Sequence, residues 1–111
     1  MAFSESLALR IRERLARRKQ IEEKKMFGGL AFLLDGNMAV AASGQGGLLV
    51  RVDPAQSDAL LATTSARLME MRGRQMRGWL RVDSEHVRTK RELERWVELG
   101  TAYARSLPAK R

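Results

Sequence analysis

The chain has 111 residues, the size of one ordinary domain, so a catalytic cleft between two domains is not expected. It contains no cysteine, which excludes disulfides, zinc–thiolate sites and thiol catalysis and fits a reducing cytosol. With 44% hydrophobic residues the chain is apolar enough to fold, and its net charge of +8 favours an acidic partner such as nucleic acid without identifying one.

The N-terminal segment has the pattern of an amphipathic helix. Ser4 is a capping residue, and Leu7, Ile11 and Leu15 follow it at four-residue spacing, which predicts a helix from about Glu5 to Lys19. The polar side of this helix carries four arginines: Arg10, Arg14, Arg17 and Arg18. They are typical of a solvated helix face, and they would equally suit contact with a nucleic-acid backbone. No apolar stretch has the length of a signal peptide or membrane span, so a cytoplasmic protein is expected.

The next part of the chain reads as a run of strands joined by short turns. A charged edge strand is predicted over Ile21 to Phe27, a hairpin joins Leu30–Leu34 to Met38–Ser43, and another turn leads to Leu48–Val52. The turn at Gly44-Gln45-Gly46-Gly47 resembles half of a phosphate loop, but a strand follows it rather than a helix, which indicates a hairpin turn.

A short helix, a second hairpin and a long helix complete the predicted fold. The short helix begins at Pro54 and ends near Ala62, and the hairpin pairs Leu68–Arg72 with Met76–Val82. Thr89 begins a capping box for the final helix. Because the strand connections are too short for parallel crossovers, we expect a two-layer α+β domain with an antiparallel sheet of about five or six strands and three helices.

The strand around Trp79 carries the most distinctive surface pattern. Arg77, Trp79 and Arg81 alternate with an apolar set, Met76, Gly78, Leu80 and Val82. If this set faces the core, two arginines flank an indole on the sheet face away from the core. Such a group suits a protein interface or self-association, and it would also suit stacking of single-stranded nucleic acid. We expect Trp79 to lie at a contact surface.

Other candidate sites have simpler interpretations. The five methionines after Met1 are typical of core filling rather than of a cofactor site. His86, the single histidine, has no nucleophile elbow nearby, and the aspartates are scattered among turns and caps. We therefore expect no enzyme activity, no cofactor and no metal site.

The motif Met26-Phe27-Gly28-Gly29, the hairpin that follows it and the strand pair near Trp79 resemble the N-terminal domain of TfoX, a bacterial regulator of competence genes. The similarity extends from Ile21 to about Pro108, and residues 1–111 resemble a stand-alone, single-domain member. The resemblance implies a helix, a curled antiparallel sheet and two more helices, similar in shape to type III secretion chaperones, and a role in competence or transcription regulation.

Three hypotheses on function follow from these observations. The first is a non-enzymatic regulatory domain that binds itself as a homodimer and an unidentified protein, through the Trp79 face or the basic helix. The second is direct nucleic-acid binding by a basic surface, and weak non-specific binding is expected in any case. The third is a small-ligand or enzymatic role in a pocket beside Gly28-Gly29, although two adjacent glycines more often reflect backbone geometry.

Overall fold

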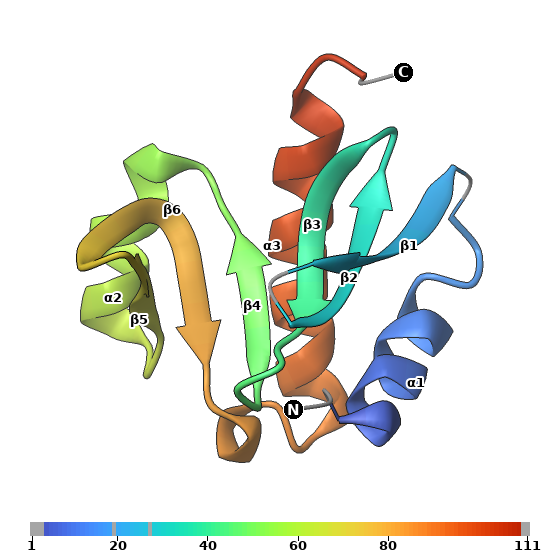
Figure 1. The fold of residues 1–111 in the computed structure, drawn as a ribbon, viewed down its shortest axis with the longest axis horizontal. Coiled ribbons are helices and arrows are strands. Elements are labelled where there is room, and N and C mark those ends of the chain that lie inside the picture. The colour runs from blue at the N-terminus through green and yellow to red at the C-terminus, as the bar shows by residue number, and fades with distance from the viewer. Residues whose placement is uncertain (1–3, 19, 27, 110–111) are drawn as a thin grey trace.

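The computed structural model describes residues 4–18, 20–26 and 28–109. Within these residues the chain forms three α-helices and one sheet of six strands (Figure 1). The elements follow in the order α1 (Glu5–Arg14), β1 (Ile21–Met26), β2 (Gly29–Leu34), β3 (Asn37–Ala42), β4 (Leu48–Arg51), η1 (Pro54–Gln56), α2 (Ser57–Thr63), β5 (Arg67–Met71), β6 (Arg74–Val82), η2 (Ser84–His86) and α3 (Lys90–Ser106), where η1 and η2 are single 3-10 turns.

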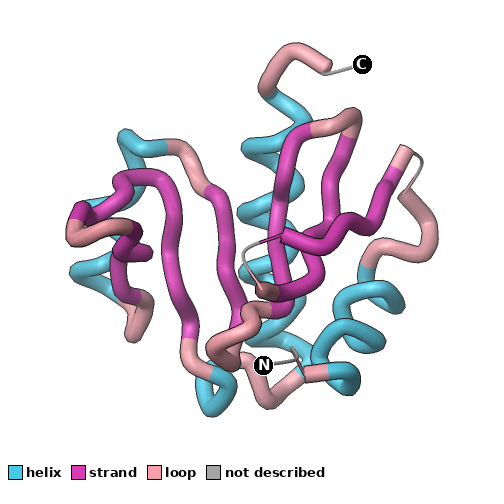
Figure 2. The backbone as a smooth tube through the Cα atoms, in the orientation of Figure 1, coloured by secondary structure: helices cyan, strands magenta, loops and turns pink. Residues whose placement is uncertain are grey.

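The sheet is antiparallel throughout, with the strand order β1-β2-β3-β4-β6-β5. Short loops join the first four strands directly, and the chain leaves the sheet between β4 and β5 to form η1 and α2 (Figure 2). The predicted α+β class, strand number and antiparallel pairing are confirmed. No helix in the described part of the chain is long and apolar enough to cross a membrane.

The main core lies between the sheet and helices α1 and α3. Leu7, Ile11 and Leu15 point into it from the N-terminal segment, as their four-residue spacing predicts. The sheet contributes alternate residues of its central strands, and α3 contributes its apolar side, including Trp96 and Val97. This face of the sheet is therefore covered by helices α1 and α3.

The helix α1 is shorter than its sequence pattern predicts. It ends at Arg14 with Leu15 as the C-cap, so the predicted end at Lys19 is wrong, and Lys19 itself lies outside the described residues. Leu15 is buried, and its carbonyl accepts a hydrogen bond from the Arg18 amide, which turns the chain toward β1. The helix ends in this turn, although Arg17 and Arg18 beyond it continue the polar side of the predicted helix.

The helix α3 lies directly on β3 because one of its residues has no side chain. A Cβ atom added at Gly100 would stand 2.4 Å from the Ala39 carbonyl oxygen, a distance that no side chain allows. The start of α3 is held by the predicted capping box, in which Thr89 and Glu92 bond each other's backbone amides at 3.1 and 3.2 Å.

Candidate interaction face of the sheet

The face of the sheet opposite α3 carries a second apolar cluster. Figure 1 looks onto this face, with α3 behind the strands and β1 passing in front of β2 and β3. The cluster contains all five methionines that follow Met1, together with Trp79 and smaller apolar residues. Its members are Met26, Ala31, Leu33, Met38, Ala41, Leu49, Met69, Met71, Met76 and Trp79, and we call it the methionine face.

The methionine face contains a pocket of about 300 Å³. Ala41 and Leu49 form its buried floor, and Met26 from β1 and Met69 and Met71 from β5 line its sides. The two edge strands of the sheet thus meet around one hollow, because the sheet curls. Polar residues complete the lining: Ser43, Gln45, Glu70, Arg72 and Arg81.

Two arginines accompany Trp79 on this face, Arg51 and Arg81, and only Arg81 belongs to the pair predicted from the sequence. Arg51 of β4 lies opposite Trp79 in the ladder, with its guanidinium carbon 5.1 Å from the indole centre and 5.5 Å from the Tyr103 ring centre. Arg81 lines the pocket, and its Nη2 lies 3.5 Å from the Ser43 hydroxyl oxygen. Trp79 is half-buried.

The predicted placement of Arg77 beside Trp79 is wrong. Gly78 has φ +86°, and the register of β5 on β6 shifts so that Leu68 pairs with Leu80 but Met69 pairs with Met76. This bulge breaks the alternation of side chains. The predicted core-facing position of Met76 is also wrong, because Met76 joins the methionine face. Arg77 turns to the helix side, 3.4 Å from the Asp58 carboxylate of α2.

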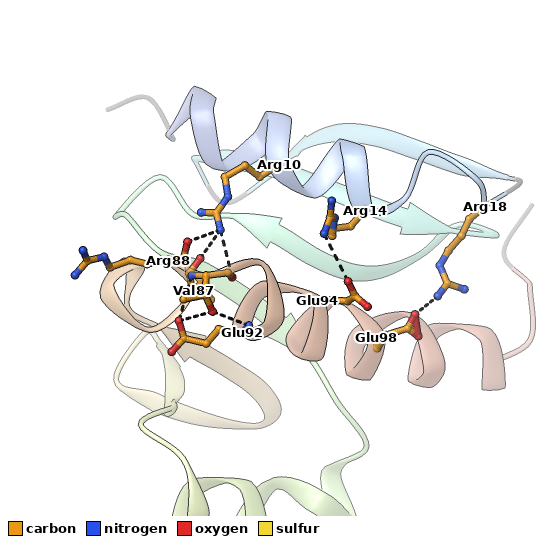
Figure 3. A network of polar contacts seen from close by, with 9 residues as sticks. Arg10, Arg14, Arg18, Val87, Arg88, Glu92, Glu94 and Glu98 are labelled. Atoms are coloured by element: carbon orange, nitrogen blue, oxygen red, sulfur yellow. Dashed lines mark hydrogen bonds and ion pairs between the residues drawn. The ribbon is translucent and has the colours of Figure 1, made fainter.

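The arginines of α1 mostly hold α1 against the rest of the protein (Figure 3). Arg10 donates to the carbonyl oxygens of Val87 and Arg88 at 2.8 and 3.0 Å. Arg14 lies 3.5 Å from Glu94, and Arg18 pairs with Glu98, so both reach α3. Arg17 is exposed beside them. Two of these four arginines thus pair with carboxylates of α3 and Arg10 bonds to backbone carbonyls, and Arg77 and Arg81 do not extend the predicted basic surface.

Residues 13–104 match the family model of the TfoX N-terminal domain. The chain belongs to the TfoX N-terminal domain family. The resemblance predicted from the Met26–Gly29 motif is thereby confirmed, and the match reaches back to Glu13 in α1. A search of curated proteins found no match.

The glycines of this TfoX N-terminal domain's motif serve close backbone packing. A Cβ atom at Gly29 would lie 2.1 Å from the Ala42 carbonyl oxygen, and one at Gly44 would lie 2.2 Å from the Gly28 carbonyl oxygen. These close contacts favour the interpretation of Gly28-Gly29 as a feature of backbone geometry. Met26 lines the pocket, so the motif also borders the methionine face, and Phe27 lies outside the described residues.

The groups of the TfoX N-terminal domain with shifted pKa values lie away from the methionine face. Glu23 has a lowered pKa because it accepts a hydrogen bond from Arg12 at 2.5 Å, and Glu92 has a lowered pKa because Thr89 donates to it. His86 lies half-buried in η2. Among the described residues, no group of three or more His, Asp or Glu could hold a metal ion.

Proposed function

We propose that this TfoX N-terminal domain is a non-enzymatic interaction domain that binds another protein on its methionine face. The observation that carries the proposal is the gathering of five methionines and Trp79 on the sheet face opposite α3. Methionine side chains are flexible and polarisable, so a methionine-rich surface adapts to irregular apolar partners. An apolar face with a polar rim is typical of a protein interaction site.

Two observations favour this proposal over the alternatives. The arginines Arg10, Arg14 and Arg18 bond within the chain, which weakens the case for a phosphate-binding helix. The pocket is lined by apolar and polar side chains in nearly equal number, and its titratable residues are Glu70, Arg72 and Arg81. An arginine stays protonated at all working pH values and makes a poor general base. A role in competence or transcription regulation is part of the proposal through the family alone.

Affinity capture from the host cell with matched variants tests the proposal. Met71→Glu places a charge at the pocket wall, and Leu9→Glu makes the same kind of change on α1, where Leu9 is 53% exposed. We expect a protein that wild type and Leu9→Glu retain and Met71→Glu loses, and that forms a complex with the purified domain. If every captured protein is insensitive to Met71→Glu, this face is not the interaction site.

Self-association stays a prediction and needs its own measurement. Trp79 is half-buried on the methionine face, so a homodimer formed there would bury it further. Light scattering of the wild type and of Trp79→Ala over a concentration series decides whether a dimer forms and whether it uses this face. A monomer at all concentrations contradicts the predicted homodimer and leaves binding of a different protein untouched.

A further inference from the structure

We propose that the methionine face binds a peptide segment that combines an apolar side chain with carboxylates. The apolar side chain enters the pocket between β1 and β5, and the carboxylates pair with Arg81 and Arg72 at its edge. This inference rests on the proposed function and names the chemistry of the partner.

The pocket has the right size and lining for an apolar anchor. An apolar cavity of roughly 150 Å³ holds a benzene ring, so the 300 Å³ of this pocket accommodates one or two large side chains. Met26 comes from β1 and Met69 and Met71 from β5, and these flexible side chains can adjust around such a group. A single buried anchor surrounded by polar contacts is the usual design of a tight peptide site.

The charges around the pocket favour acidic residues next to the apolar anchor of the bound peptide. Five arginines of the described chain form ion pairs with carboxylates, and none of them lines the pocket: Arg12, Arg14, Arg18, Arg67 and Arg77. No carboxylate of the described residues pairs with Arg51, Arg72 or Arg81. The pocket lining carries these last two arginines against one acid, Glu70, so its charge complements an acidic segment.

The arginines near the pocket also argue against two other occupants of the methionine face, a second copy of the chain and nucleic acid. A symmetric pair of copies would bring two sets of Arg72 and Arg81 into one interface, because a two-fold interface uses the same patch on both copies. This concentrates like charge there, which is unfavourable. Nucleic acid would need an accessible ring for stacking, and one side of the Trp79 ring already carries Arg51. An acidic, apolar peptide satisfies both the pocket and its edge.

Selection from random linear peptides displayed on phage tests the proposal. Wild type serves as bait, with counter-selection on Met71→Glu, and the best binder is synthesised for fluorescence polarisation. We expect the selected peptides to contain both apolar residues and Asp or Glu. Arg81→Glu should weaken the binding at least about tenfold, and replacing the peptide's acids with Lys should restore binding to Arg81→Glu. Arg17→Glu, an equal charge change at the exposed turn after α1, should leave affinity unchanged.

Each other outcome overturns the proposal in a recognisable way. Peptides that depend on Met71 but show no acidic enrichment, or bind Arg81→Glu as well as wild type, refute the acidic partner and leave the interaction face standing. Absence of any Met71-dependent peptide, together with captured proteins insensitive to Met71→Glu, removes both proposals. Competition by oligothymidine, or a dimer that Met71→Glu dissolves, assigns the face to nucleic acid or to a second copy. Arg81→Met replaces Arg81→Glu if circular dichroism shows that the charge reversal unfolds the domain.

Discussion

The Arg51 guanidinium lies between two aromatic rings, 5.1 Å from the centre of Trp79 and 5.5 Å from that of Tyr103. It thereby links the methionine face to α3, since Tyr103 belongs to that helix. Arg51→Met should lower the free energy of unfolding by about 1 kcal/mol, because the cation–π attraction is lost while the apolar stem is kept. Urea denaturation measures the loss, and Arg74→Met at the exposed start of β6 is the control. Equal stability of the two variants would contradict the stacking.

The stability of the protein should depend on Arg10 far more than on Arg17. Arg10→Met removes the hydrogen bonds to the carbonyl oxygens of Val87 and Arg88, and we expect it to cost about 1 to 2 kcal/mol. Arg17→Met changes an exposed residue of the same charge and should stay within about 0.5 kcal/mol of wild type. Thermal unfolding compares the two variants, and a reversed order would show that Arg10 does not dock α1.

The capping box of α3 should make stability depend on pH. The pKa of Glu92 is lowered in the folded protein because it accepts hydrogen bonds from the Thr89 amide and hydroxyl. A lowered folded-state pKa means that the stabilisation is complete above the ordinary Glu value of about 4.3 and is lost as the pH falls below it. The stability difference between wild type and Glu92→Gln should therefore be largest near neutral pH and shrink in acid.

Two further variants separate this effect from a general response to acid. Thr89→Ala should cost about 1 kcal/mol at neutral pH, as expected for a lost N-cap. Glu85→Gln removes the same charge at an exposed position near the start of α3 and is the matched neutralisation. Urea titrations at a series of pH values test the prediction, and a Glu92→Gln difference that grows in acid would contradict it.

The Gly28-Gly29 motif should tolerate no side chain at its second position. A methyl group at Gly29 would meet the Ala42 carbonyl oxygen, which belongs to the β3 backbone and has little freedom to move. We expect Gly29→Ala to cost at least about 2 kcal/mol, comparable with severe overpacking. Gly73→Ala meets open space and suffers only from its positive φ, so it should cost about 1 kcal/mol. Urea denaturation ranks the two, and equal losses would argue against the close contact.

Binding to nucleic acid should be weak and sensitive to salt. The net charge of +8 attracts phosphates, but Arg14 and Arg18 already pair with α3. We expect single-stranded and duplex DNA to bind without sequence preference at low salt and to dissociate near physiological ionic strength. Fluorescence titrations across a salt series measure this. Tight binding at physiological salt that is lost in the combined Arg14→Glu, Arg77→Glu and Arg81→Glu variant would favour the nucleic-acid alternative.

Local patterns were sufficient to predict most of the fold. Turn residues such as Asp35-Gly36 and the capping box at Thr89 act within a few residues, so the hairpins and the start of α3 could be located. The end of α1 had no such signal, because the helical pattern continues through Arg17 and Arg18 beyond its last residue, Arg14. Contacts between residues distant in the sequence leave no short-range pattern either. For the same reason the bond from the Asn37 side chain to the Pro108 carbonyl, at 2.9 Å, had no local signal.

The candidate site was predicted only in part, and the reason lies in one glycine. Strict alternation along β6 puts Arg77 and Trp79 on one face, but the bulge at Gly78 separates them. A glycine inside a strand pattern is a recognised sign of a bulge, so this signal was present in the sequence. The partnership of Arg51 with Trp79 depends on the pairing of β4 with β6, which are not consecutive strands, and no short-range pattern reveals it.

The clustering of methionine sulfur on one face supplies the protein with a chemical reporter. Brief treatment with dilute peroxide converts accessible methionines to sulfoxides, and mass spectrometry locates each added oxygen. Met26, Met71 and Met76 are partly exposed on the methionine face, whereas Met38 and Met69 are buried, so the two sets provide a signal and an internal reference. Protection of the first set reveals whether the face is covered without any change to the sequence.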